Sequence, residues 1–456
     1  MRDVLELRNL AGAFALFGVS LSCATVDARP DFERARADIR AATGVQDVFD
    51  AEAPPLTNAE IEAVLHDGLT LDETLRLTLL NNRRLQAGFM KLGIARADYV
   101  QAGLLANPEL SLAFLFPSGG GRTKFAGGLS QNVADLWQLP AREDAALADL
   151  EHGFVEVSRL AGELVSDARS AYFEIVAALE TQRVANSSTD LAQRALDGVR
   201  SRVASGVAPK TDENLALSVA LGAELTARRS EREVSDARRR LGALLSLELD
   251  LATVTLTDPL PAITAQAADA AALVELGKAH RLDLRAADAA VSAAEAQVEF
   301  EKGRVVREAN VGVAVERPEH GSSVHVLSGV TGSVQLPLFD QNQAQIARAE
   351  FRCAELTRER EALVAEATQA IRAAFERHAS ATRTATFVTD ELVRESERAA
   401  VAAQRAYDLG DITVLAWLDA QRAALLSQHA GIEARLELVR ASIDLERNVG
   451  VPLDGR

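Results

Sequence analysis

The chain has 456 residues, of which 48% are hydrophobic but only 4% aromatic, and its formal net charge at pH 7 is -17. The acidic balance without a basic stripe argues against nucleic-acid binding, because a negative surface repels the phosphate backbone. Scarce aromatic and abundant alanine side chains argue against a thick globular core and favour closely packed helices, as in coiled coils and bundles.

The N-terminus has the features of an export signal. Arg2 and Arg8 precede a short apolar run over 10–21. This run is too short to span a bilayer but suits a signal peptide. It ends in Ser20-Leu21-Ser22-Cys23, which resembles a bacterial lipoprotein signal. We expect 1–23 to be a signal peptide of the lipoprotein type, with lipidation of Cys23. The only other cysteine in the sequence is Cys353, and two cysteines are too few for a disulfide framework.

Residues 24–68 are predicted to form an extended linker with a short helix near 59–66, because Pro54-Pro55 interrupts a mixed stretch. Thr70 and Glu73 have the spacing of a capping box, so a helix begins here and continues to about 105. The remaining elements of this half follow from side-chain period and turn residues: strands at about 109–116 and 124–133, a helix over 141–203, a turn near Gly206 and a helix over 212–247.

The second half begins after a proline-containing connector over 251–268. A helix over 269–307 leads to strands at about 310–316 and 324–336. In the latter, apolar residues occupy every second position, which is typical of a two-faced strand. After Pro337 the apolar period becomes three to four, with Asp340 or Asn342 as capping acceptors, and a long helix is predicted to about 407. A turn near Gly410 precedes the last helix.

The two halves correspond at an offset of about 200 residues. Leu85 pairs with Leu284, and the tip glycine Gly206 pairs with Gly410. We therefore predict two tandem repeats, over 69–250 and 269–452. Each consists of a helix, two strands and a long helical hairpin, which makes the fold class α+β.

Four strands of this length could cross a bilayer at a tilt, but four cannot close a barrel. Open strand edges are not tolerated in lipid, so two copies could give eight strands or three copies twelve. The alternative is an exported structural coiled-coil protein with small β-hairpins outside the membrane.

Three motifs resemble the TolC-type outer membrane efflux factor family. They are Leu336-Pro337-Leu338-Phe339-Asp340-Gln341-Asn342, the tip Gly410-Asp411-Ile412-Thr413 followed by Leu418-Asp419-Ala420-Gln421-Arg422, and the weaker first tip with Arg202 and Gly206. The first of these resembles the cobalt-zinc-cadmium branch of the family. The resemblance covers roughly Leu69 to Pro452.

This resemblance implies a homotrimeric membrane protein in the outer membrane of a Gram-negative bacterium. A twelve-stranded barrel would cross that membrane in contact with its lipid, and a helical barrel would extend into the periplasm. It also implies a passive exit duct for a tripartite efflux or type I secretion system, without catalysis or cofactors. The expected partners are a periplasmic adaptor protein and an inner membrane pump, with the resistance-nodulation-division type as one candidate.

The resemblance also suggests site residues. Asp419 corresponds to a carboxylate that constricts the periplasmic entrance, and Asp212 could contribute to the same gate, whereas Ala416 stands where a second acidic residue is common. The expected hairpin tips and adaptor contacts are Arg202, Gly206, Val207, Gly410, Asp411 and Ile412. The expected strand-to-helix junction consists of Pro337, Phe339 and Asp340.

Sequence motifs for catalysis are missing: there is no phosphate-binding glycine-rich loop, no GxSxG and no CxxC. Glu319, His320 and His325 form the nearest approach to a metal-binding cluster, and their spacing matches no zinc motif. The sequence therefore predicts neither an enzyme nor a metal site.

Replacing Cys23 with Ser should abolish acylation and change signal processing, because the lipid is attached through the cysteine sulfur. Intact-mass measurement of the purified protein checks this. An unchanged mass and unchanged processing would refute the lipoprotein assignment.

Overall fold

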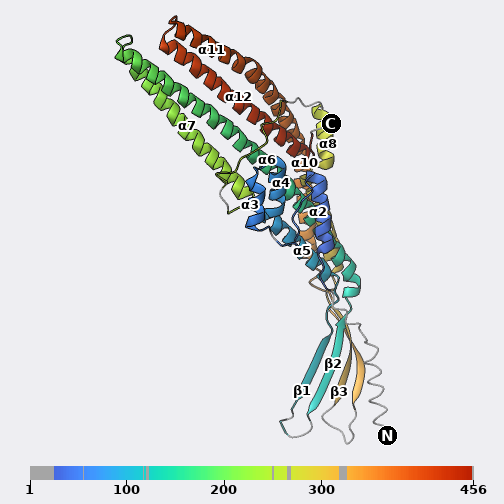
Figure 1. Cartoon of the computed structure of the whole chain (residues 1–456). Helices are drawn as coiled ribbons and strands as arrows, with labels where there is room; N and C mark the ends of the chain where they lie inside the picture. The colour runs from blue at the N-terminus through green and yellow to red at the C-terminus, as the bar shows by residue number, and fades with distance from the viewer. Residues whose placement is uncertain are drawn as a thin grey trace.

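The molecule is elongated, with a four-stranded sheet at one end and paired long helices at the other (Figure 1). The computed structural model describes residues 25–54, 56–116, 118–119, 123–248, 251–263, 269–317 and 326–453. The expected signal peptide with Cys23 lies outside the described residues, as do Glu319, His320 and His325.

The elements in chain order are α2 (Arg29–Thr43), α3 (Asn58–His66), α4 (Leu71–Asn81), α5 (Arg83–Ala102), β1 (Glu109–Leu115), β2 (Lys124–Asn132), α6 (Asp135–Ala204), α7 (Lys210–Leu244), α8 (Ala270–His280), α9 (Leu282–Gly303), β3 (Ala309–Arg317), β4 (Leu327–Val334), α10 (Gln343–Phe387), the π-helix η1 (Val388–Val393), α11 (Arg394–Leu409) and α12 (Val414–Val449). From α4 onward the same arrangement occurs twice, since α4 to α7 have the same order of helices and strands as α8 to α12. The predicted tandem repeat is therefore confirmed.

The long helices pack through small side chains. α6 alone has 70 residues, and its buried positions include Ala161, Ala168 and Ala177. Alanine allows neighbouring helix axes to approach closely, so a thin rod gains burial only against other helices. Among the described residues, no helix combines the length and the apolarity that a membrane crossing requires.

The sheet is antiparallel in the order β1-β2-β3-β4, and it separates apolar from small and polar side chains. The register places Leu112 opposite Gly127, Leu129 opposite Val313, and Val313 opposite Val330. One face therefore carries Leu110, Leu112, Phe114, Phe125, Leu129, Val311, Val313, Val315, Val330 and Val334. The opposite face carries mainly Gly, Ala, Ser, Thr and Asn, with one ion pair between Lys124 and Glu316 at 2.6 Å. Neither outer strand, β1 or β4, has a second partner within the described residues.

The predicted helix from the capping box to about 105 is divided at Asn82. The capping box of Thr70 and Glu73 is present as predicted. Asn82, however, has an extended backbone, and its Oδ1 accepts hydrogen bonds from the amides of Arg84 and Leu85, so it caps α5. Its Nδ2 donates to the carbonyl of Leu244 at 2.7 Å. The asparagine therefore fixes a bend between α4 and α5 and ties it to the end of α7.

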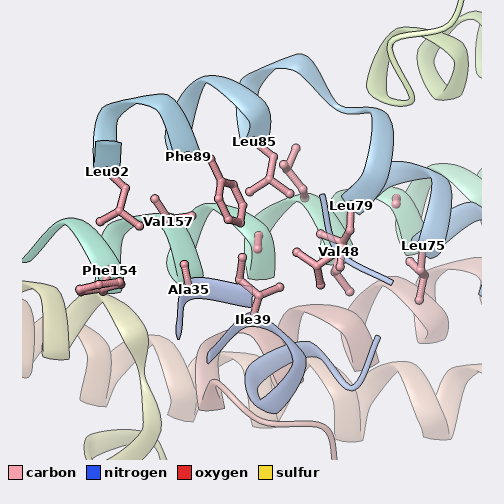
Figure 2. Close-up of a cluster of buried hydrophobic side chains, with 14 of the residues drawn as sticks. Ala35, Ile39, Val48, Leu75, Leu79, Leu85, Phe89, Leu92, Phe154 and Val157 are labelled. Carbon is pink, nitrogen blue, oxygen red and sulfur yellow. The ribbon is translucent and has the colours of Figure 1, made fainter. Parts of the chain in front are cut away.

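The prediction of an extended linker over 24–68 is wrong for α2, although α3 agrees with the predicted short helix. Figure 2 shows Ala35 and Ile39 of α2 in the same apolar cluster as Phe89 of α5 and Val157 of α6. The spacing of four residues puts both α2 side chains on one face, and both are fully buried.

Charged groups hold the rest of α2 in place. Arg34 donates two hydrogen bonds to the Glu151 carboxylate, at 2.5 and 2.6 Å, and its guanidinium lies 4.1 Å from the centre of the Phe154 ring. The buried Asp31 accepts a hydrogen bond from Arg96 at 2.6 Å. The N-terminal segment is thus part of the first repeat's core.

Ile39→Ala should lower the melting temperature of the purified protein clearly, since emptying a fully buried Ile site costs about 2–5 kcal/mol. The exposed neighbour Asp38, changed to Ala, is the control and should leave the melting temperature nearly unchanged. Equal, small effects of both substitutions would contradict a structural role for α2.

Candidate functional site

The two helical hairpins end in the same backbone motif. Gly206 and Gly410 both adopt the left-handed conformation, with φ of 74° and 84°. In the first tip, the amide of Val207 donates to the carbonyl of Arg202 at 2.9 Å and that of Gly206 donates to Val203. In the second tip, the amide of Asp411 donates to Ala406 at 2.8 Å and that of Gly410 to Tyr407. This is the Schellman pattern, which closes the last carbonyls of a helix and reverses the chain.

At both positions the backbone conformation, and not a lack of space, favours glycine. A Cβ atom added at Gly206 or Gly410 would meet no atom within 4 Å. Other residues rarely adopt this positive φ, so the strain falls on the backbone. The structure therefore agrees with the turns predicted near these two residues.

Side chains from both tips meet in one cluster. The Arg202 Nη1 of the first tip donates to the Tyr407 hydroxyl of the second at 3.1 Å, and the guanidinium lies 5.6 Å from the ring centre. The Tyr407 ring stacks on Trp417 with 4.8 Å between centres. Ile412, an expected adaptor contact, packs against this apolar cluster, whereas Val207 is exposed. The tips thus form one packed unit with exposed ends.

The predicted gate carboxylates lie close to these tips. Asp419 is exposed on α12, next to the buried Leu418, and Asp212 is half-buried in the first turn of α7. Among the described residues, no basic group lies within ion-pair distance of either carboxylate. The neighbouring Glu213 differs, because a hydrogen bond from Lys210 lowers the pKa of its carboxyl. Asp419 therefore presents an unpaired acid near the end of the molecule.

The strand-to-helix junction is both apolar and tightly bonded. Phe339 is 92% exposed, and Leu336 and Leu338 are exposed with it, while Pro337 is half-buried. The Asp340 carboxylate accepts a hydrogen bond from the Asn342 amide at 3.0 Å and pairs with Arg307 at 3.0 Å. These bonds hold the start of α10 against the segment between α9 and β3.

The predicted capping role of Asn342 is wrong. Its backbone is left-handed, and its side chain caps no helix amide. Instead, Asn342 Nδ2 donates to the carbonyl oxygen and to the carboxylate of Glu301, at 2.8 and 2.7 Å. A partner 41 residues away in sequence therefore competes successfully with the local cap.

A cavity of about 620 Å³ lies where α6, the start of α9 and the end of α12 meet. Charges in its wall pair with one another: Arg281 with Asp283 at 2.6 Å, and Arg169 with the buried Glu446. The Arg169–Glu446 pair connects the two repeats, whereas Arg281 and Asp283 both belong to the second. Within the described parts of the chain, no group of three or more His, Cys, Asp or Glu residues has the arrangement of a metal site.

Comparison with known proteins agrees with this architecture. Residues 273–451 match a protein family described as "Outer membrane efflux protein". The matched residues lie within the second repeat. The cobalt-zinc-cadmium resistance protein CzcC of Cupriavidus metallidurans is 24% identical over 84% of this chain and 90% of its own length. The pyoverdine export outer membrane protein OpmQ of Pseudomonas aeruginosa is 26% identical over 83% of this chain and 85% of its own.

Among solved structures, the CmeC outer membrane channel of Campylobacter jejuni has a TM-score of 0.71 at 14% identity, over 89% of this chain and 90% of that one. At this identity the likeness concerns the fold alone. Together these findings confirm the TolC-type resemblance and the predicted outer membrane location. The family consists of efflux channels and not of enzymes.

Sequence reasoning missed three features of this region. It did not identify Tyr407 as the partner of Arg202, it did not place Trp417 on Tyr407, and it did not anticipate the π-helix η1. The Arg202–Tyr407 contact had one signal in the sequence: an arginine lies close to one predicted tip and a tyrosine close to the other.

Proposed function

We propose that the protein is a homotrimeric outer membrane channel that provides the exit duct of a tripartite efflux or type I secretion system. Cargo passes through it passively, without catalysis. The observation that carries the proposal is the two-faced four-stranded sheet, whose outer strands lack a second partner within the described residues and whose strands continue into long helices.

The sheet has the side-chain pattern of a membrane barrel wall. Its apolar face suits lipid, and its small, polar face suits a water-filled interior. In lipid, the unpaired backbone groups of β1 and β4 must find partners, and a neighbouring copy can supply them. Three copies then give twelve strands, the number implied by the family resemblance.

The two edges differ, so the contact joins unlike surfaces and repeats around a ring. Exposed apolar residues accompany each edge near the sheet's helical end. Leu336, Leu338, Phe339 and Phe351 follow β4, and Leu104, Leu105, Leu136 and Trp137 flank β1 and β2. Burying these groups against the next copy would add hydrophobic stabilisation to the strand pairing.

The helical hairpins would extend this ring into the periplasm, with the tips farthest from the membrane. We assign the entrance to the tips, with Asp419 and Asp212 as candidate gate residues. One Asp419 from each copy would form a ring of like charges that attracts cations and constricts the opening. The exposed Val207 and Asp411 at the tip ends suit contact with a periplasmic adaptor, which would connect the duct to an inner membrane pump.

The N-terminus is compatible with a lipid anchor on Cys23. The described helix α2 begins at Arg29, beside the α5 residue Arg96 that bonds Asp31. The five residues 24–28 can span at most about 17 Å when extended. Since α5 runs toward β1, an acyl chain on Cys23 could reach the periplasmic surface of the membrane.

CzcC and OpmQ are named for cobalt-zinc-cadmium resistance and for pyoverdine export, at nearly equal identity to this chain. Such different names fit a duct whose wall selects little, while the pump chooses the cargo. We keep metal ions and small organic molecules as the candidate classes. The rival proposal, an exported structural coiled-coil protein, does not account for a sheet with one largely apolar face, most of whose leucine, valine and phenylalanine side chains are exposed.

Cysteine pairs across the proposed strand contact test the ring. Ser111→Cys on β1, combined in turn with Thr331→Cys or Ser333→Cys on β4, should give a covalent trimer on a non-reducing gel, in a Cys353→Ser background. These residues share the polar face and lie on opposite edges of one protomer, so they can only join different copies. Each single-cysteine variant is the control. A monomer that is soluble without detergent would support the coiled-coil rival instead.

Asp419→Ala should raise single-channel conductance in planar bilayers by about twofold, because the shorter side chain widens the proposed constriction. Asp419→Glu keeps the charge and is the matched control. Conductance that is the same in all three proteins would remove Asp419 from the gate.

A further inference from the structure

The polar face of the sheet changes character at the end farthest from the helices (Figure 1). At this end each strand places one residue on the polar face, next to the segments that join β1 to β2 and β3 to β4. In chain order these residues are Leu115, Lys124, Glu316 and Leu327, which we call the collar. The collar therefore has two leucines on the edge strands and two opposite charges on the inner strands.

The strand register makes the collar a continuous band of side chains. Leu115 lies opposite Lys124, and Glu316 lies opposite Leu327. These two pairs occupy adjacent rows of the sheet, and the ion pair between Lys124 Nζ and Glu316 Oε1, at 2.6 Å, joins them across β2 and β3. Since cross-strand residues on one face are neighbours, the four side chains form a band across the whole sheet.

The middle of the polar face carries only small, uncharged side chains. Between the collar and the helical end of the sheet, this face consists of Ser111, Ala113, Ala126, Gly128, Ser130, Gly312, Ala314, Gly329 and Thr331. At Gly329 an added Cβ atom would meet no atom within 4 Å, so packing inside one protomer does not require the small residue there. The collar is therefore a step from small to large side chains along the strands.

Stabilisation of the fold does not account for this step. The side chains of Lys124 and Glu316 are 37% and 44% exposed, and ion pairs in such surroundings contribute little to folding. Leu115 and Leu327 are also exposed, and they lie on the face that would be turned away from lipid in the proposed barrel. The collar side chains are therefore free to contact what moves along this face.

We infer that the collar is the narrowest part of the strand barrel and that it discriminates among departing solutes by size and by charge. The inference rests on the proposed channel function, in which the polar face lines a water-filled bore and the segments that join the strands face the exterior. Each of three copies would then contribute two leucines and one ion pair to the exit. Such a lining favours small solutes over folded protein domains as cargo.

The two kinds of collar residue have different effects on a solute. The leucines lie on β1 and β4, the strands that meet between copies, so they narrow the exit with apolar groups at each junction. The charges of Lys124 and Glu316 largely cancel while both are present. If one of them is removed, three copies of the other surround the exit, attract solutes of opposite charge and repel those of like charge.

Labelling of a cysteine behind the collar, on intact cells, tests the inference without any need to open the periplasmic entrance. Ser130→Cys, in a Cys353→Ser background, places a thiol on the polar face between the collar and the helices. Thiol-reactive polyethylene glycols of increasing size, added outside the cells, should label this thiol at rates that fall steeply with reagent size. The Cys353→Ser protein without the new cysteine gives the blank.

Leu115→Ala combined with Leu327→Ala should widen the collar. The largest reagent that still labels the parent should then react about fivefold faster, while the smallest should change little. Both leucines are exposed, so their truncation should cost the fold little. Leu112→Ala with Val330→Ala truncates apolar side chains of the same two strands on the opposite face. This matched control should leave all labelling rates unchanged.

Cationic and anionic thiosulfonate reagents of similar size test the ion pair in the same assay. With Lys124→Gln, the cationic reagent should label the cysteine about twofold faster and the anionic reagent about twofold more slowly than in the parent. Glu316→Gln should reverse both changes. The double variant, which has neither charge, should restore the parent's ratio of the two rates.

The same dependence on reagent size in the parent and the leucine variant would overturn the collar, as would charged reagents that respond to neither charge variant. A smallest neutral reagent that labels the detergent-purified protein but not intact cells would instead refute the proposed channel, because the polar face would then be closed to the exterior. If the leucine variant does not reach the outer membrane, the charge variants still decide the outcome.

Discussion

The backbone groups along the outer edges of the sheet impose the strongest constraint on this molecule. Every residue of β1 and β4 is exposed, yet one sheet face carries a nearly continuous set of leucine, valine and phenylalanine side chains. Water can solvate the open strand edges, but exposing the apolar face to water is unfavourable. Lipid can cover the apolar face, but it cannot satisfy the hydrogen-bonding groups of the open edges. In the proposed ring, the strands of neighbouring copies would satisfy both requirements. The helices obey the same logic, since rods lined with alanine are stable only beside other rods.

The tandem repeat explains why closure is geometrically simple. Each repeat supplies a β-hairpin and a helical hairpin, and the two β-hairpins pair through β2 and β3 inside one protomer. The seam between repeats is held by buried ion pairs such as Arg169–Glu446 and by side chains that cross it, including Gln138 to the carbonyl of Val306 at 2.6 Å.

Much of this architecture could be predicted from short-range patterns. Period-two strands, the Thr70 capping box and the tip glycines are local signals, because each depends on neighbours within a few residues. Asn342 and Asn82 were missed because distant groups, Glu301 and Leu244, decide what their side chains bond.

The other omissions have similar causes. α2 was missed because its many charges hide a narrow stripe formed by Phe32, Ala35 and Ile39, and those charges find partners such as Glu151 far along the chain. The π turn has no marker in the sequence Val-Thr-Asp-Glu-Leu-Val. For the candidate site, motif resemblance located the tips and Asp419, but only three-dimensional packing brought Arg202 to Tyr407.

The small side chains on the polar face of the sheet have one further consequence. A Cβ atom at Gly312 would lie 2.5 Å from the carbonyl oxygen of Leu129, and one at Gly128 would lie 3.0 Å from Ser111 Oγ. Backbone proximity therefore excludes a side chain at Gly312, whatever solute passes along this face. In the proposed ring, small side chains would line most of the channel, so its width there would be set largely by how the strand backbones pack.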